Sequence, residues 1–334
     1  MNVSNYTLYG IQSSAERYFW AAYYIFVLLS SIIGDTLILY ASIHKDAFKL
    51  NKFIVSVLQN IAVSDLIISI TVFLPKVTSL LTNNWALGIA MCYASVYISI
   101  GTLAAAISFI AVMSTSKFLL LKYPLRASQW TKKRGLQVCA SIWVLCILTF
   151  ILTFLVVRGD DVQFDFRIYS CDYGFNAEVW EIIVPIWSLT FQILPCCITF
   201  GTTIPTLKYL VDASKSARRV QGSIPWQGAM TVTLTAVVYC ISNVPLFVYC
   251  IGYNFIERKP SSLFHVQFYR VAAFVGSINV MANFYIYALT IRSFRRFLNS
   301  EIQKLVSVIR QDSGNRTSEG KLSIADHLNP RIFS

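Results

Sequence analysis

The chain is short of charged residues. Asp, Glu, Lys and Arg make up 13% of its 334 residues, whereas soluble domains contain about a quarter. This deficit, with 56% hydrophobic residues, indicates that much of the chain lies where charge is costly. Lipid requires every spanning backbone group to be hydrogen-bonded within a helix or a closed barrel. The composition therefore favours one helical membrane domain over two soluble domains.

Histidine and cysteine are scarce as well. The three His are scattered, and the eight Cys lack CxxC spacing and are too sparse for a disulfide scaffold. The net charge of +12 does not indicate nucleic-acid binding, because the charges fall between apolar runs. The first 17 residues show no basic start followed by a short apolar run, so a cleaved signal peptide is not expected.

Long apolar runs dominate the rest of the chain. A spanning helix needs about 20 mostly apolar residues, and seven segments qualify. The sequence therefore predicts an all-α membrane protein built as a seven-transmembrane helix bundle. The predicted spans are Phe19–Ser42, Phe53–Leu80, Ile89–Leu121, Leu136–Val157, Trp180–Leu210, Trp226–Tyr253 and Phe264–Ile291.

A short amphipathic helix is predicted after the seventh span. Phe294, Phe297 and Leu298 recur at helical spacing with arginines between them, which is typical of a helix on the inner membrane surface. The predicted organisation is an extracellular N-terminus at 1–18, a seven-transmembrane domain at 19–291, the amphipathic eighth helix at 292–303 and a cytoplasmic tail at 304–334.

The distribution of Lys and Arg predicts the orientation. Loops 44–52, 122–135 and 211–225, together with the tail, hold most of the 28 basic residues. The positive-inside rule then places a multi-pass protein in the cell membrane, with the N-terminus extracellular and the C-terminus cytoplasmic. Asn2 and Asn5 both begin glycosylation sequons in the outer segment, which agrees with this orientation.

Polar groups inside the spans are informative, because each costs about 2.5–3.5 kcal/mol at mid-bilayer. Asp35 and Asp65 lie in the first two spans, and Asn279 and Asn283 share one face of the seventh. Two interpretations stay open: a cation or water site, or a hydrogen-bonded cluster that locks helix packing. No metal or other cofactor is expected, except that a sodium ion could lie near Asp65.

Short motifs in six predicted helices resemble those of rhodopsin-like (class A) G-protein-coupled receptors. Asn60-Ile-Ala-Val-Ser-Asp65-Leu is similar to the family's Asn-Leu-Ala-x-x-Asp-Leu, and Ser116-Lys117-Phe118 stands in place of its Asp-Arg-Tyr box. The resemblance covers about residues 20–300, and the chain looks like a divergent member. Further matching residues are Trp85, Gly88, Cys92, Pro124, Leu125, Trp143, Pro195, Pro245, Asn283, Tyr287 and Phe294.

The resemblance implies a receptor rather than an enzyme. Family members bind an extracellular ligand between the outer helix halves, then swing the sixth helix outward for a heterotrimeric G protein. Arrestin, a receptor kinase and membrane lipid are further implied partners, and nucleic acid is not. The tail contains hydroxyl residues that a kinase could phosphorylate: Ser307, Ser313, Thr317, Ser318 and Ser323. Such residues are equally common in any flexible polar segment.

The resemblance also implies roles for individual residues. It implies a disulfide between Cys92 and Cys171, both predicted to face an oxidising compartment; two free thiols are the alternative. G-protein coupling is implied for Ser116, Lys117, Phe118 and Tyr287, and helix bending and relay for Pro195, Ile107, Tyr239, Asn243 and Pro245. A ligand pocket is implied for Ser99, Leu103, Trp187, Phe191, Phe247, Tyr269 and Ser277, although helix packing is the commoner role of such residues.

Several departures from the family pattern alter these expectations. Asp35 replaces an asparagine, and two carboxylates close together in low dielectric cannot both ionise easily. We therefore expect at least one to be protonated when the pair is dry. Lys117 replaces the arginine of the Asp-Arg-Tyr box and Ser116 its acid. Two outcomes stay open. Either the inactive state is less stable and basal signalling is raised, or the receptor couples more weakly to its G protein.

Two residues that other receptors of the family use to bind their ligands are absent from this sequence, which narrows the class of ligand. Ser99 stands where amine receptors place an acid, and Ser277 stands where opsins place the retinal lysine. The acidic outer segment 158–181 could steer a basic peptide or be a solvated surface. A peptide or a small chemosensory molecule is favoured.

Other classes of protein fit less well. A transporter or channel is disfavoured by the odd helix number and by the absence of a charged relay beyond Asp35 and Asp65. A membrane enzyme is disfavoured because no nucleophile–base pair or zinc motif is present. The main alternative is a receptor fold with weak or no G-protein coupling, acting as a scavenger or a dimer partner.

Overall fold

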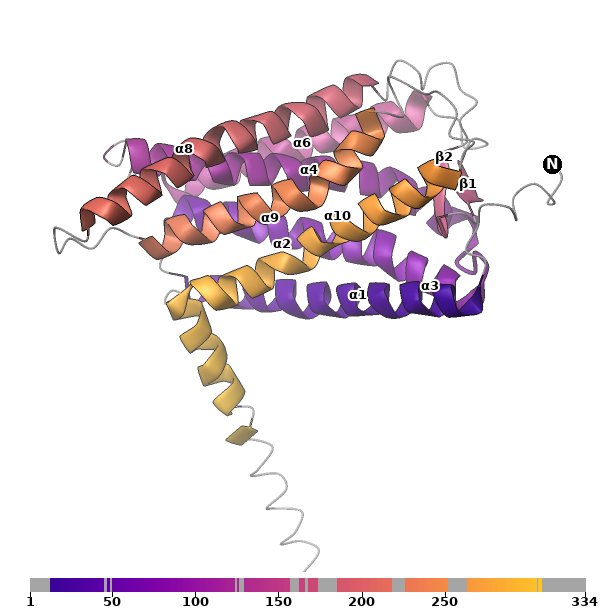
Figure 1. Ribbon diagram of the computed structural model, residues 1–334, viewed down its shortest axis with the longest axis horizontal. Helices are drawn as coiled ribbons and strands as arrows, with labels where there is room; N and C mark the ends of the chain where they lie inside the picture. Colours follow the sequence, from indigo (N-terminus) through magenta and orange to yellow (C-terminus); the bar gives the residue numbers. More distant parts are fainter. Residues whose placement is uncertain are drawn as a thin grey trace, which may run out of the picture.

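The computed structural model is a bundle of long helices (Figure 1). It describes residues 13–44, 47–48, 50–123, 125, 129–156, 162–165, 168–173, 185–217, 226–251, 263–304 and 306–307. The sequons at Asn2 and Asn5 lie outside these residues, as do Ser313, Thr317, Ser318 and Ser323.

Seven helical spans form the bundle, as predicted. The first three are α1 (Ser14–Ile43), the combination of α2 (Lys52–Ile68), η2 (Ser69–Phe73) and α3 (Leu74–Thr82), and α4 (Gly88–Lys122). The last four are α6 (Lys132–Val156), η4 (Leu189–Ile193) continuing into α8 (Leu194–Ala217), α9 (Trp226–Ile251) and α10 (Leu263–Thr290). Among the described residues, five of these spans are long and apolar enough by themselves to cross a membrane, and α6 and α9 complete the seven.

The helix ends differ from the predicted ones in places. The structure begins α1 at Ser14, within the segment expected to be the extracellular N-terminus. Ser13 caps this helix by accepting a hydrogen bond from the backbone of Glu16 at 3.1 Å, and the acidic first turn complements the helix dipole. Polar capping therefore extends α1 beyond its apolar stretch.

Two spans contain a π-helical turn next to a proline. η2 ends just before Pro75, and η4 ends just before Pro195. A proline lacks the backbone N–H and its ring collides with the carbonyl four residues earlier. The carbonyls concerned belong to Thr71 and Phe191, inside the two wide turns, so each π turn accommodates the ring within a continuous span.

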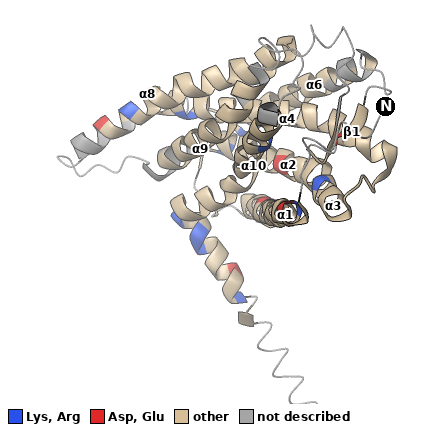
Figure 2. Cartoon of the chain, turned by 45° about the vertical axis from the view of Figure 1, so that its right-hand side comes forward, with Lys and Arg blue, Asp and Glu red and all other residues tan. Residues whose placement is uncertain are grey.

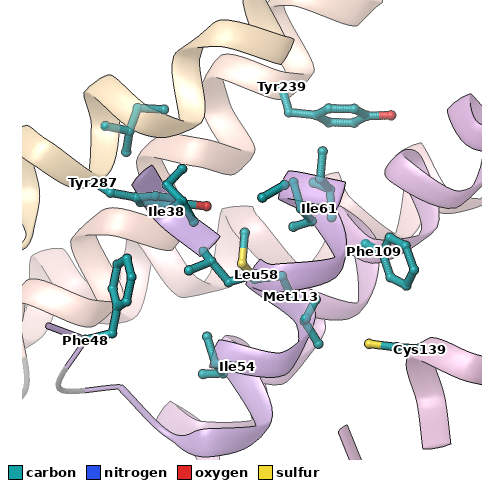
Figure 3. Close-up of a cluster of buried hydrophobic side chains, with 14 of the residues drawn as sticks. Ile38, Phe48, Ile54, Leu58, Ile61, Phe109, Met113, Cys139, Tyr239 and Tyr287 are labelled. Atoms are coloured by element: carbon teal, nitrogen blue, oxygen red, sulfur yellow. The ribbon is translucent and has the colours of Figure 1, made fainter. Parts of the chain in front are cut away.

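The centre of the bundle is a buried apolar cluster. α4 packs against α2, α6, α8 and α9, while α1 and α8 lie at opposite edges (Figure 1). The cluster includes Ile38, Ile54, Leu58, Ile61, Phe109, Met113, Tyr239 and Tyr287 (Figure 3). Large apolar side chains also cover the outside, such as Leu289 with 70% of its surface exposed, as lipid contact requires.

One end of the bundle carries a small β-hairpin that was not predicted. β1 (Val162–Asp165) pairs antiparallel with β2 (Ser170–Tyr173), and Phe164 lies opposite Cys171. The hairpin is an addition to the predicted helix bundle, and the sequence did not indicate it because four residues of alternating pattern are too short a signal in a segment identified mainly by its acids. The hairpin lies beside the starts of α1 and α10 (Figure 1).

The opposite end carries the short helix that follows α10. It spans residues 292–304 and leaves the bundle at a steep angle (Figure 1). Phe294 is fully buried and stacks on Phe48 with ring centroids 4.9 Å apart, whereas Arg295 and Arg296 are exposed. Blue patches mark this segment in Figure 2, where most of the bundle is tan.

Candidate functional site

Two acids lie in the middle of the bundle, on neighbouring helices. Asp35 in α1 and Asp65 in α2 are each 1% exposed. The Ser31 hydroxyl donates to Asp35 Oδ2 at 2.7 Å. The Ser69 hydroxyl lies 2.7 Å from that of Ser31 and 2.8 Å from the backbone carbonyl of Asp65. The hydroxyls of Ser31 and Ser69 therefore link the carboxyl group of Asp35 to the backbone of Asp65.

The seventh span completes this cluster through one of the two predicted amides. Asn283 Nδ2 donates to Asp65 Oδ2 at 2.9 Å. Asn279 is also buried, one turn earlier in α10, but it is Asn283 that bonds the acid. The structure thus brings Asp35, Asp65 and Asn283 together in one cluster.

The cluster contains more acceptors than donors. Asp35 Oδ1 and Asn283 Oδ1 are buried without a hydrogen-bond partner in the described part of the chain. A buried unsatisfied polar atom costs about 1–3 kcal/mol, so a proton, a cation or a water would be stabilised there. The described residues contain no group of three or more His, Cys, Asp or Glu arranged to hold a metal ion.

Close helix contact fixes the position of Asp35. A Cβ atom built on the preceding Gly34 would lie 2.6 Å from Cβ of Phe284. Only glycine therefore permits α1 to approach α10 this closely. Phe284 occupies the place of the family's proline, and α10 continues through it without a break.

The inner end of α4 carries the altered Asp-Arg-Tyr box. The Ser116 hydroxyl donates to the Val112 carbonyl of its own helix at 2.6 Å, and a neutral hydroxyl cannot supply the negative charge of the family's acid. Lys117 is 7% exposed, and the sequence of α9 contains no acidic residue. The sixth span therefore offers no carboxylate to hold this cation.

Tyr239, one of the expected relay residues, is fully buried in the bundle. Ile107 and Tyr239 belong to the same buried cluster, and the Tyr239 hydroxyl lies 3.5 Å from Cys196 Sγ, next to Pro195. The Asn243 amide donates to the Tyr239 carbonyl at 3.0 Å. This side chain thus turns back onto α9, two residues before Pro245, where the family has a bulky aromatic ring.

The predicted ligand pocket is only partly assembled. Trp187 and Phe191 lie side by side with ring centroids 6.2 Å apart, and both pack with Leu103 on the central cluster. The Trp187 indole N–H is buried and has no hydrogen-bond partner within the described ranges. Ser99 instead donates to the backbone of its own helix at 2.8 Å, and the Phe247 side chain is not among those described.

Two other predicted pocket residues belong to different surroundings. The Ser277 hydroxyl lies 2.8 Å from that of Tyr23 in α1, which is a helix-packing contact. Tyr269 lines a separate hollow between α1, α3 and α10 with Lys76 and Arg270. Sequence reasoning missed these two cations as site residues, although a lysine inside an apolar span was a usable signal.

The expected disulfide is present at the hairpin end of the bundle. Cys92 at the start of α4 is bonded to Cys171 in β2, with Cα atoms 5.5 Å apart. The bond ties the hairpin to the third span. Tyr169 supports the hairpin turn by donating to Asn83 Oδ1 at 2.7 Å.

Comparison with known proteins agrees with this arrangement. The family described as 7 transmembrane receptor (rhodopsin family) matches residues 34–287. Probable G-protein coupled receptor 174 of Mus musculus is 24% identical over 303 aligned residues, covering 85% of this chain and 86% of that receptor. Succinate receptor 1 of Rattus norvegicus is 25% identical over 215 aligned residues, which cover 61% of this chain and 61% of that receptor. Melatonin receptor type 1A of Gallus gallus is 22% identical over 317 aligned residues, which cover 88% of this chain and 84% of that receptor.

The matched range runs from α1 to α10, so the seven spans form one receptor domain of a multi-pass membrane protein. The chain belongs to the rhodopsin family of seven-transmembrane receptors and is a G-protein-coupled receptor. Its general partner is a heterotrimeric G protein, and proteins of this family are receptors rather than enzymes. The matches support this function and not the alternative of a receptor fold that has lost signalling.

Proposed function

We propose that the receptor responds to a small extracellular molecule and signals through an inner surface centred on Lys117. The observation that supports this most directly is that Lys117 is buried at the inner end of α4 while the sequence of α9 contains no acid. An ion pair with α9 cannot hold the resting state, so the inactive conformation loses one stabilising contact. Since an agonist works by binding the open state better, a less stable inactive state raises the output without ligand.

A small ligand agrees with two observations. The names of two relatives specify small molecules, succinate and melatonin. In this chain, the indole N–H of Trp187, which has no hydrogen-bond partner among the residues the structure describes, lies in the same cluster as Phe191 and Leu103. One buried donor surrounded by aromatic and aliphatic side chains suits a compact ligand with an acceptor group.

Basal signalling provides the test. The full-length receptor is expressed with a panel of G-protein dissociation sensors, and wild type is compared with Lys117→Ala and Asp65→Asn. We expect output above the empty-vector level that falls in Lys117→Ala. Equal output from wild type and Lys117→Ala, at matched surface expression, contradicts a role for Lys117 in coupling.

We also propose that the N-terminus is extracellular and the tail cytoplasmic. The disulfide and hairpin then lie outside, where the compartment is oxidising, and residues 292–304 lie on the inner membrane surface with their arginines toward lipid headgroups. Arrestin and a receptor kinase would act on the tail. Antibody labelling of N-terminal and C-terminal epitope tags on intact cells tests the orientation, and labelling of the C-terminal tag without permeabilisation contradicts it.

A sodium ion near Asp65 is proposed as a modulator. Oxygen ligands would come from Asp35 Oδ1, Asp65 and Asn283 Oδ1. The first and last of these atoms have no hydrogen-bond partner in the described part of the chain, so the residues fit a hard cation. Sodium chloride should therefore raise the melting temperature of the purified receptor more than choline chloride does. If sodium chloride raises the melting temperature of Asp65→Asn by the same amount as that of the wild type, the sodium site is contradicted.

A further inference from the structure

Lys117 is a buried cation without a counter-charge. Its side chain lies near the inner end of α4 and is 7% exposed. In the part of the chain that the structure describes, it makes no hydrogen bond or ion pair, and no acidic side chain there acts on it electrostatically. A buried charge without a partner is strongly unfavourable, so an anion beside Lys117 would stabilise the bundle.

A buried hydroxyl group without a partner lies on the same face of α4. Ser114 is three residues before Lys117, and residues with this spacing are neighbours on a helix surface. Ser114 Oγ is buried and has no hydrogen-bond partner among the described residues. Other hydroxyls of α4 differ, because those of Ser108 and Ser116 donate to backbone carbonyls one turn earlier, at 2.8 and 2.6 Å. Ser114 can therefore donate to a group beside the Lys117 ammonium.

The helices that pack against α4 carry further hydroxyls of the same kind. α4 packs against α8 and α9. Thr203 Oγ1 in α8 and Thr233 Oγ1 in α9 are both buried without a partner in the described ranges. The sequence of α9 contains no acid, and Asp212, the acid of α8, is exposed. These three helices therefore hold buried hydroxyl donors and a buried cation, and none of their described side chains is a buried carboxylate.

We propose that Lys117 binds a chloride ion inside the bundle, with the Ser114 hydroxyl as a second donor. A small monovalent anion suits this site, because it neutralises one ammonium and accepts hydrogen bonds from hydroxyl groups. The ion takes the part of the acid that Ser116 replaces, and it stabilises the resting conformation. This regulatory role rests on the proposed function, since it acts on the inner surface centred on Lys117, whereas binding of the ion does not require a G protein.

The melting temperature of the purified full-length receptor tests the site directly. Choline chloride is compared with choline gluconate at equal ionic strength, so that sodium ions play no part. At ten times its half-saturating concentration, chloride should raise the melting temperature by about 2–5 °C, and bromide should act in the same way. In crystals grown with bromide, an anomalous scattering peak should lie next to the Lys117 ammonium.

Substitutions separate the ion site from general effects of salt. Lys117→Met should abolish the chloride-dependent rise, whereas Lys117→Arg, which keeps the charge, should retain it. Ser114→Ala should raise the half-saturating chloride concentration about tenfold, because it removes a hydrogen bond to a charged group. Ser108→Ala is the matched control on the same helix and should leave that concentration unchanged. The melting temperature in gluconate identifies variants that fail to fold, and Lys117→Gln then replaces Lys117→Met.

Three outcomes overturn the proposal: a melting temperature that does not depend on chloride, a chloride effect of equal size in Lys117→Met, or a bromide peak found only elsewhere. The first outcome is expected if Lys117 is a neutral amine in the bundle.

Basal nucleotide exchange tests the regulatory role. Exchange by receptor-containing membranes should be slower in chloride than in gluconate, and faster exchange in chloride contradicts stabilisation of the resting conformation. A chloride-dependent melting temperature without output on any G-protein sensor supports the ion site and contradicts coupling. Basal output from a receptor whose stability does not depend on chloride contradicts the ion site alone.

Discussion

Asn283 in α10 donates a hydrogen bond of 2.9 Å to the carboxylate of Asp65 in α2. The two residues are 218 positions apart in the chain, and their side chains are each 1% exposed. This contact joins the second and seventh spans in the middle of the bundle. It also leaves the amide oxygen of Asn283 facing an acid-rich site without a partner among the described residues.

Loss of this hydrogen bond should destabilise the receptor. Asn283→Ala leaves a buried carboxylate oxygen without its donor, so we expect the free energy of unfolding to fall by about 1–3 kcal/mol. The purified receptor's melting temperature measures this. Asn279→Ala, one turn earlier on the same face, is the matched control and should have a smaller effect; equal losses would mean that the hydrogen bond is not the cause.

At least one carboxyl of the Asp35–Asp65 pair should be protonated. Two like charges buried near each other in low dielectric are strongly unfavourable, and two oxygens of the cluster have no hydrogen-bond donor within the described ranges. Infrared difference spectroscopy should therefore show a carboxylic-acid C=O band that changes in Asp35→Asn or Asp65→Asn. Two ionised carboxylates at neutral pH in sodium-free buffer contradict this expectation.

Gly34→Ala should weaken the contact between α1 and α10. The new methyl group would lie 2.6 Å from Cβ of Phe284, so one helix must shift, at a cost of about 1–3 kcal/mol. Gly201→Ala in α8 is the control, because nothing lies within 4 Å of its added Cβ. That change should be neutral or slightly stabilising in the same thermal assay. A Gly34→Ala receptor as stable as wild type would show that the interface tolerates a shift.

Removal of the Cys92–Cys171 disulfide should loosen the hairpin. The bond links residues 79 apart, and loss of a native disulfide typically costs about 2–4 kcal/mol. We expect Cys171→Ser to lower the melting temperature. Cys197→Ser, which removes an exposed free thiol, should not. A reducing agent should reproduce the first result in wild type only.

Ser116→Asp should lower basal signalling. It restores an acid directly before the cation Lys117, so the resting state regains the local pair that the family normally uses. G-protein sensors without ligand measure the effect, and Ser116→Asn, of equal size but uncharged, is the control. Unchanged output in Ser116→Asp, at equal surface level, would show that the local pair does not set the resting state here.

Most of the fold could be predicted because lipid imposes it. Each span must satisfy its own backbone hydrogen bonds, so long apolar segments such as Gly88–Lys122 are visible in the sequence without any tertiary information. The β-hairpin and the early start of α1 were not predicted. Four-residue strands give almost no periodic signal, and the start of α1 depends on the cap at Ser13.

Part of the polar cluster could be predicted, because spacing along a helix shows which residues share a face. Asn283 and Asp65 were expected in one cluster and are hydrogen-bonded, and Tyr239 and Ile107 belong to the same buried cluster. The ligand pocket was less predictable, because a side chain's neighbours depend on helix rotation. Ser277 lies against Tyr23, and Tyr269 lies against Tyr249 and lines a separate hollow, which no spacing rule anticipates.

The sequence by itself determined that this protein spans a membrane seven times and which polar residues lie at mid-bilayer, because burial of charge in lipid is costly wherever it occurs. Only the tertiary structure decided which of those residues touch. Gly34 permits α1 to approach Phe284, Asn283 rather than Asn279 reaches Asp65, and Lys76 and Arg270 converge from α3 and α10. Contacts between distant segments depend on helix rotation and on close packing between helices, which are properties of the assembled bundle.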